Sequence, residues 1–321
     1  IDFLIKNSGN RKIVEVDFFG GEPLMNFEVV KKIVEYGREE AKKHGKTIKY
    51  TITTNGVLLD DEKVSYINEN FSNVVLSLDG RKEINDGMRK RIDGSGSYDV
   101  IAPKIKNFVS KRGNKEHYVR GTFTAKNLDF TNDVLHLADM GIKEISVEPV
   151  VEKEDTDYSI KKEHMERILK EYDRLTEEYI KRIDEGRPFS FYHFKISLDN
   201  GPCIKKRLQG CGAGFEYAAI TPDGEIYPCH QFVGNELYKL GSVDSGIENT
   251  QLQSQFMKSD IYKRKDCSQC WARFYCSGGC FANNYNMNGD INKPYELSCE
   301  MQKKRFECAI AIKTYEILRR K

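Results

Sequence analysis

Hydrophobic and polar positions along the first half of the chain predict strands that alternate with helices. Runs rich in β-branched and aromatic residues indicate strands at 13–19, 47–53, 74–78, 117–124 and 145–151. Apolar residues spaced three and four apart indicate helices. These cover 27–43, 60–70, 98–111, 131–140 and 161–184, with Asn26 and Thr131 as expected caps. Such alternation is typical of parallel βαβ units and predicts an α/β fold.

Small or polar residues follow three of the predicted strands. They are Gly20-Gly21, Thr54-Asn55-Gly56 and Asp79-Gly80. Ligands of parallel α/β folds bind beyond the carboxyl ends of the strands, so we expect ligand contacts here. For each segment taken alone, a turn is the better explanation.

The second half of the chain differs from the first in composition and in hydrophobic periodicity. From about residue 199, glycine and cysteine become frequent and long helical periods disappear. A hairpin is predicted at 216–229, turning at 221–224, and a last helix at 300–320. We therefore predict a first domain at 1–190, a cysteine-rich domain at 191–299 and a C-terminal helix at 300–321.

Charge and composition narrow the range of partners. The chain has 51 Lys and Arg against 49 Asp and Glu, a net charge of +2, which argues against a broad nucleic-acid footprint. No run approaches the ~18 apolar residues of a membrane span, and no signal peptide opens the chain. We expect a cytoplasmic protein without nucleic-acid or membrane partners. Residues 1–6 resemble the tail of a helix, so further sequence is expected before Ile1.

The cysteines indicate a metal or cluster site. None precedes residue 203, their number is odd and no secretion signal is present, which argues against disulfides. Short spacings bring thiolates together at low entropic cost, and the hairpin would fold Cys229 toward Cys211. Zinc and iron–sulfur clusters fit the spacing about equally, and free thiols fit it less well. The nine cysteines are Cys203, Cys211, Cys229, Cys267, Cys270, Cys276, Cys280, Cys299 and Cys308.

This spacing, with four residues between Gly224 and Cys229, resembles the SPASM domain that follows radical S-adenosylmethionine (SAM) barrels. The resemblance implies two auxiliary [4Fe–4S] clusters. The fourth ligand of the first is left open between Cys203 and a substrate thiolate. Cys308 fits no position and is expected to be a packed free thiol. The implied ligands are Cys211, Cys229 and Cys280 for the first cluster, and Cys267, Cys270, Cys276 and Cys299 for the second.

The first half resembles the same family. Gly20-Gly21-Glu22-Pro23 is similar to its GGEP motif, which contacts the amino group of SAM. Glycine lets the backbone approach closely, and the Glu22 carboxylate would complement an ammonium group.

Further SAM contacts are implied at the next strand ends. Thr54 and Asn55, and then Ser77 and Asp79, match positions that meet the ribose and carboxylate of SAM in this family. Arg89, Arg120 and Glu148 are weaker candidates, for which structural ion pairs are the alternative.

The resemblance predicts a partial (β/α)6 radical SAM barrel. The family's Cys-x3-Cys-x2-Cys motif, which holds the SAM-cleaving [4Fe–4S] cluster, does not occur in the 321 residues. We expect that motif and the first strand upstream of Ile1.

The segment 210–234 resembles thioether-forming maturases of SCIFF peptides. His230 stands where anaerobic sulfatase maturases have an aspartate, and it would be a base, a proton relay or a structural residue. The expected reaction joins a cysteine sulfur to a carbon in a Cys-rich precursor peptide. It would use a SAM-derived 5′-deoxyadenosyl radical and electrons from a ferredoxin or flavodoxin, under anaerobic or low-oxygen conditions. The alternatives are sulfatase maturation or another peptide oxidation, and a non-catalytic peptide-binding or electron-transfer module.

Overall fold

The computed structural model describes residues 1–152, 156–198 and 203–319. The chain forms two compact units. The first comprises Ile1–Pro149 and Glu177–Tyr192, and the second comprises Val150–Thr176 and His193–Lys321. The chain therefore passes between the units more than once, whereas the sequence pattern predicts a single passage, near residue 190, from the first domain to the cysteine-rich domain.

The first unit is built on a six-stranded parallel sheet with the order β1-β2-β3-β4-β5-β6. The five predicted strands are confirmed. A sixth, β6, is only two residues long and pairs with β5, so hydrophobic periodicity could not reveal it. The strands are β1 (Ile13–Phe18), β2 (Thr47–Thr54), β3 (Asn73–Ser77), β4 (Tyr118–Phe123), β5 (Glu144–Pro149) and β6 (Ser190–Phe191).

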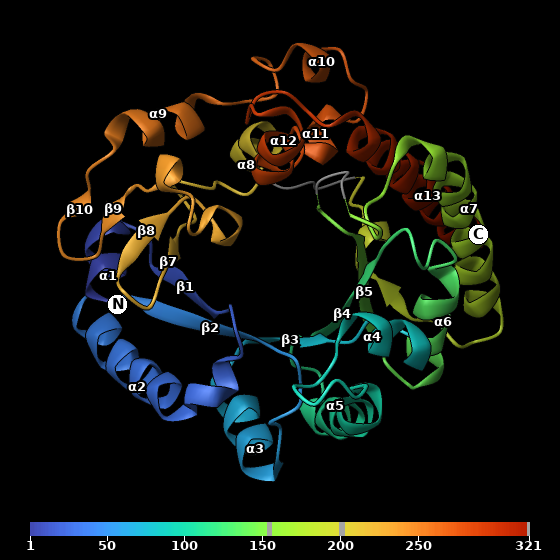
Figure 1. Cartoon of the computed structure of the whole chain (residues 1–321), viewed down its shortest axis with the longest axis horizontal. Helices are drawn as coiled ribbons and strands as arrows, with labels where there is room; N and C mark the ends of the chain where they lie inside the picture. Colours follow the sequence, from blue (N-terminus) through green and yellow to red (C-terminus); the bar gives the residue numbers. More distant parts are fainter. Residues whose placement is uncertain (153–155, 199–202, 320–321) are drawn as a thin grey trace. The chain divides into compact units, whose positions relative to one another are not determined.

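Helices cover one face of this sheet. Figure 1 shows α2, α3 and α5 along the outer side of the strands. The predicted helices are confirmed, while the short α4 was not predicted. The helical elements up to this point are α1 (Asp2–Asn7), η1 (Pro23–Asn26), α2 (Phe27–Lys43), α3 (Asp61–Asn70), α4 (Lys82–Met88), α5 (Tyr98–Arg112), α6 (Thr131–Asp139), η2 (Lys162–His164) and α7 (Met165–Asp184), whose residues are shared between the two units.

Of the two predicted helix caps, one lies at the expected cap position and the other does not. Asn26 occupies the cap position of α2 but makes no side-chain capping bond. The prediction for Thr131 was wrong: Phe130 precedes α6, and Thr131 lies fully buried in the first turn. The Thr131 side chain packs inside the unit, so this residue belongs to the first turn of α6 and does not cap the helix.

The two faces of the sheet differ in polarity. Buried and more accessible residues alternate along β2 and β4, as the period of two requires. Ile52, Leu76 and Val119 are completely buried in the core. Parallel sheets are usually apolar on both faces, but the opposite face here is polar. Its residues include Glu15, Asp17, Lys49, Thr51, Ser77, Arg120, Thr122, Ser146 and Glu148, which pair in register from strand to strand.

The second unit contains a small antiparallel sheet with the order β10-β9-β8-β7. The predicted hairpin is confirmed by the pairing of Ile220 with Ile226. The Gly224 N–H donates to the Thr221 carbonyl at 2.9 Å, and Gly224 has φ +84°, which glycine adopts without strain. The strands are β7 (Ala219–Ile220), β8 (Glu225–Tyr227), β9 (Gly241–Ser242) and β10 (Gly246–Ile247).

Short helices make up most of the rest of the second unit. The last helix begins at Glu296 and not at 300, so Cys299 lies inside it. The remaining helical elements are η3 (Tyr192–Phe194), α8 (Ile204–Gln209), η4 (His230–Phe232), η5 (Glu236–Tyr238), α9 (Thr250–Lys258), α10 (Lys265–Ser268), α11 (Arg273–Cys276), α12 (Phe281–Asn288) and α13 (Glu296–Arg319).

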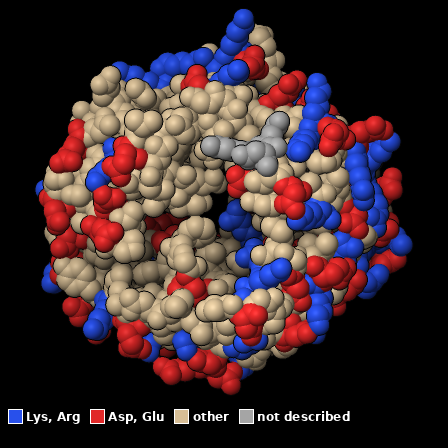
Figure 2. All heavy atoms as spheres, viewed as in Figure 1, with Lys and Arg blue, Asp and Glu red and all other residues tan. Residues whose placement is uncertain are grey.

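Basic and acidic side chains are interspersed over the face drawn in Figure 2. This mixture agrees with the net charge of +2. Within the described part of the chain, no helix has both the length and the apolar character needed to cross a membrane.

Candidate functional site

The turn after β1 brings a carboxylate to the end of β2. Gly20 and Gly21 have φ of +87° and +52°, and a Cβ on either would meet nothing within 4 Å. Backbone conformation, and not space, therefore requires glycine here. Glu22 accepts hydrogen bonds from the Leu24 N–H at 3.1 Å, the Thr54 hydroxyl at 2.8 Å and the Asn55 N–H at 2.8 Å. An ionised carboxylate has about four acceptor positions, so the bonds from described residues leave one position for a ligand.

The β2 end is held rigidly by local hydrogen bonds. The Thr54 hydroxyl also accepts from the Gly56 N–H at 3.1 Å, and Asn55 Oδ1 accepts from the Val57 N–H at 2.9 Å. Thr54 is 1% exposed. Its side chain thus contributes to the structure of the turn, while Asn55 remains half-buried.

Asp79 follows β3 and forms a buried ion pair. The Arg89 guanidinium donates to its two carboxylate oxygens at 2.7 and 2.9 Å. The Thr122 N–H donates to Oδ1 at 2.9 Å, which ties Asp79 to β4. Asp79 is 3% exposed, so a buried carboxylate charge must be compensated, and these bonds compensate it. Both residues have a structural role in this arrangement, the alternative weighed for Arg89.

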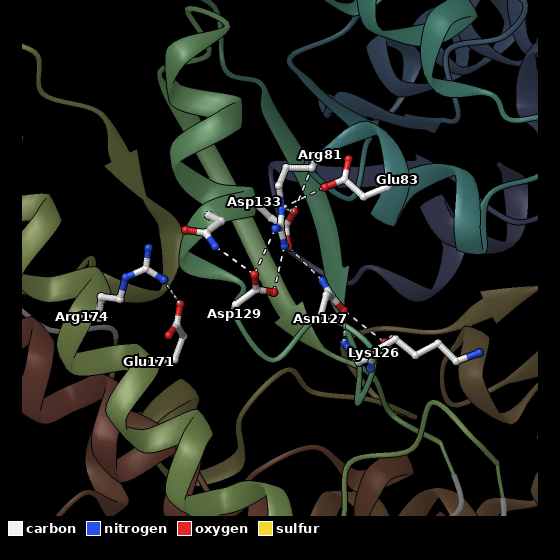
Figure 3. A network of polar contacts seen from close by, with 10 residues as sticks. Arg81, Glu83, Lys126, Asn127, Asp129, Asp133, Glu171 and Arg174 are labelled. Carbon is white, nitrogen blue, oxygen red and sulfur yellow. Dashed lines mark hydrogen bonds and ion pairs between the residues drawn. The ribbon is translucent and has the colours of Figure 1, made fainter.

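A polar network fixes the turn beyond Asp79 (Figure 3). Arg81 donates to Asp133 Oδ1 at 2.8 Å and to both oxygens of Asp129 at 3.0 and 2.9 Å. Asn127 donates to Asp133 at 3.1 Å. Desolvation opposes ionisation of Asp129, but hydrogen bonds from Arg81 and Asn132 outweigh it and lower the pKa of Asp129. The network holds the start of α4 against the start of α6.

The polar sheet face carries the remaining predicted residues of the first unit. Ser77 pairs in register with Arg120, and Arg120 forms an ion pair with Glu148 at 2.8 Å. Asp17 belongs to the same face and was missed by sequence reasoning, although strand alternation could have indicated it. Desolvation raises the pKa of Asp17, and Arg120 partly offsets this.

Four of the predicted cysteine ligands share one pocket. Cys267, Cys270, Cys276 and Cys299 line a cavity of about 540 Å³, together with Arg273 and Lys303. Burial, followed by neighbouring thiolates, raises the pKa of Cys299 to about 12. Burial also raises the pKa of Cys267 to about 11. Thiolates raise one another's pKa values at short range, so Cys299 lies close to Cys276 and Cys267.

A second set of thiols gathers around Cys229. Burial raises its pKa to about 11, and Cys280 and Cys211 raise it further. Cys203 is exposed at the residue preceding α8. His230 is exposed and begins η4.

Cys308 is a packed thiol. It is 4% exposed in α13, and its Sγ donates to the Tyr172 carbonyl at 3.6 Å. Desolvation raises its pKa. Its burial agrees with the expectation of a packed thiol.

The donor sets suit iron–sulfur clusters chemically. Among the described residues, no three His, Cys, Asp or Glu side chains are grouped as ligands of one metal ion. The four pocket cysteines line shared walls instead. The raised pKa values of Cys267, Cys276 and Cys299 mean that a positively charged group is needed to keep these three thiols ionised, and an iron–sulfur core would supply that charge.

Two protein-family models match separate parts of this chain. Residues 3–144 match the radical SAM superfamily. This range includes strands β1–β4 and the turn after β1 that contains Glu22. Residues 211–271 match the SPASM family, described as an iron-sulfur cluster-binding domain.

The chain is also similar to characterised enzymes. It is 26% identical over 316 residues to a cysteine-type anaerobic sulfatase-maturating enzyme of Clostridium novyi, covering 93% of this chain and 81% of the relative. It is 28% identical to a serine-type anaerobic sulfatase-maturating enzyme of Bacteroides thetaiotaomicron, covering 92% and 75%. A solved structure of native anSMEcpe with bound AdoMet and a Kp18Cys peptide matches with a TM-score of 0.76 and 22% identity, covering 97% and 87%. The last match establishes the similarity of fold.

Proposed function

Because the chain belongs to the radical SAM superfamily and carries a SPASM iron–sulfur domain, we propose that it acts in a peptide maturase. Such an enzyme oxidises a side chain of a ribosomally made peptide. The observation that carries the proposal is that the turn after β1 that contains Glu22 and two groups of cysteines occur in one chain. SAM and [4Fe–4S] clusters are the cofactors of these two families.

We assign the two thiol groups to separate auxiliary clusters. Cys267, Cys270, Cys276 and Cys299 would hold the cluster in the 540 Å³ pocket. Cys211, Cys229 and Cys280 would hold the other. Its fourth iron ligand would be the exposed Cys203 or a thiolate of the bound peptide.

The first unit would bind SAM at the carboxyl ends of β1, β2 and β3. The free acceptor position of Glu22 suits the ammonium group of SAM, and the Gly20–Gly21 backbone permits close approach. Asn55 and Ser77 would contact the rest of the ligand. The Asp79–Arg89 and Arg120–Glu148 pairs would hold the surrounding backbone and the polar face in place.

The reaction we favour is thioether formation. SAM held at Glu22 would supply the adenosyl radical for removal of a hydrogen atom, and a cluster held by the auxiliary cysteines would supply an acceptor for the remaining electron. In the peptide, a C–H bond and an S–H bond break and a C–S bond forms. The thiol proton would pass to a base, for which His230, exposed at the start of η4, is the candidate. The presence of His230, where sulfatase maturases have aspartate, favours this reaction.

Formylglycine formation in a sulfatase is the second candidate. Two relatives that span most of this chain are sulfatase-maturating enzymes by name. This reaction oxidises a single cysteine or serine without forming a crosslink.

Mass spectrometry after anaerobic turnover with SAM distinguishes the two. The full-length natural protein would be incubated with a Cys-rich peptide or with a peptide carrying a sulfatase cysteine motif. Thioether formation predicts loss of two hydrogens and of one alkylatable thiol. An aldehyde that reacts with hydrazide would instead support formylglycine formation. Failure to cleave SAM, with all clusters present, would contradict both.

A further inference from the structure

Among the residues that the structure describes, Arg264 is a buried cation without a carboxylate partner. It is 1% exposed, and its Nη2 donates to the Ser259 hydroxyl at 3.0 Å. Its Nη1 donates to the Gly278 carbonyl, and the guanidinium lies 4.6 Å from the Phe281 ring centroid. Nε has no hydrogen-bond partner within the described structure. A guanidinium remains protonated in proteins, and a buried charge without an opposite charge is costly.

The negative groups that act on Arg264 are mainly thiolates. Burial lowers the pKa of its guanidinium, and Cys267 and Cys276 are the strongest groups opposing this, followed by Asp260 and Cys211. The effect is reciprocal. Arg264 lowers the pKa of Cys267, although burial outweighs it. Arg264 therefore lies within electrostatic range of cysteines from both thiol groups.

The local backbone keeps the guanidinium there. Gly278 lies between Cys276 and Cys280, which we assign to different clusters. A Cβ at Gly278 would lie 2.0 Å from Arg264 Nη1. The φ of Gly278 is +86°, so both the available space and the backbone conformation favour glycine here. The Ile261 N–H donates to the Leu208 carbonyl at 3.1 Å, which ties the segment before Arg264 to α8, close in sequence to Cys211.

We propose that Arg264 is the buried countercharge of the auxiliary clusters and raises their reduction potentials. A fixed positive charge in a low-dielectric interior stabilises the more negative, reduced form of a cluster. The effect is larger for the cluster on Cys267 and Cys276, because the Cys267 N–H donates to the Arg264 carbonyl at 2.9 Å and the guanidinium binds the Gly278 carbonyl, two residues after Cys276. The inference rests on the cluster assignment proposed above.

Redox titration followed by electron paramagnetic resonance tests this role. In protein reconstituted anaerobically, Arg264→Met should lower the midpoint potential of the pocket cluster, and that of the other cluster by less. Arg264→Lys keeps the charge and should stay closer to the parent value. Lys263→Met is the matched control, because it removes the same charge from the neighbouring, exposed residue, where solvent screens it. A Cys229→Ser background isolates the signal of the pocket cluster.

Unchanged midpoint potentials in cluster-loaded Arg264→Met would overturn the proposal. If that variant binds no iron, Arg264→Gln takes its place, since an amide can replace part of the hydrogen bonding. Loss of clusters in both neutral variants but not in Arg264→Lys would support the need for the charge. Loss in Arg264→Lys as well would show that shape is required and would refute the proposal. Absence of iron and sulfide from the parent protein would instead refute the cluster assignment.

Discussion

The Glu22 carboxylate accepts a hydrogen bond from the Thr54 hydroxyl at 2.8 Å, and this bond joins the end of β1 to the end of β2. Together with the bond from the Asn55 N–H, it makes Glu22 part of the structure of the proposed SAM site. Stability and ligand binding should therefore change together when this residue is altered.

Replacement of Glu22 by alanine is expected to lower the free energy of unfolding by about 1.5–3 kcal/mol, because it removes hydrogen bonds to a charged group. SAM affinity should fall at the same time. Urea denaturation and isothermal titration calorimetry measure the two effects. Glu28→Ala is the control, since its exposed pair with Lys31 contributes about 0–1 kcal/mol. An unchanged SAM affinity in Glu22→Ala would contradict the assignment.

Gly80→Ala should destabilise the first unit by about 1–3 kcal/mol. Gly80 has φ +118°, and a Cβ there would lie 2.3 Å from Asp133 Cβ, so the substitution disturbs the Arg81 network as well. Thermal unfolding followed by circular dichroism measures the change. Gly87→Ala in α4 is the counterpart, because it has open space and no positive φ; it should be neutral or slightly stabilising. Equal effects of the two changes would argue against this account.

Acid should weaken the pair between Asp139 and Arg182, which are 2.8 Å apart. The hydrogen bond from Arg182 lowers the pKa of Asp139 below its ordinary value of 3.8. The stabilisation is therefore complete above that ordinary value and is lost as pH falls through the lower pKa of the folded state. Because the Asp139 side chain is 56% exposed, the contribution should be under about 1 kcal/mol. Asp139→Asn should flatten the dependence of melting temperature on pH between about 5 and 2, whereas parallel curves would refute the role.

Single cysteine substitutions should divide the bound iron into two parts. Cys299→Ser should lose about four iron and four sulfide ions, and Cys229→Ser should lose a separate set of about four. Cys308→Ser should lose none, since its thiol packs against Tyr172. Iron and sulfide analysis with visible spectra provides the measurement. Zinc in place of iron in the parent protein, or iron loss in Cys308→Ser, would count against the two ligand sets.

Periodicity was sufficient for most of the first unit. β1–β5 and α2, α3, α5, α6 and α7 were predicted because each has a long enough hydrophobic period. β6 and α4 were not, because short elements depend on contacts with the rest of the fold. Asn249 does accept a hydrogen bond from the Leu252 N–H at the start of α9, a capping signal that the sequence contained but that was not used.

The site was predicted less evenly. Motif spacing was enough to indicate the thiol groups around Cys229 and Cys299. It could not reveal that Thr54 and Asn55 already occupy two of the about four acceptor positions of Glu22, because that depends on the register of neighbouring strands. Arg264 was missed because arginine is mostly exposed in proteins, and nothing in its neighbouring residues indicates burial.

The polar face of the parallel sheet has a thermodynamic consequence. A surface carrying Thr51, Arg120, Thr122 and Glu148 is hydrated before any ligand arrives, so a molecule that binds there replaces ordered water instead of removing apolar area from solvent. Association on such a surface should give a favourable enthalpy and only a small negative heat-capacity change. Its affinity should also depend strongly on whether the incoming groups reproduce the hydrogen bonds of the displaced water.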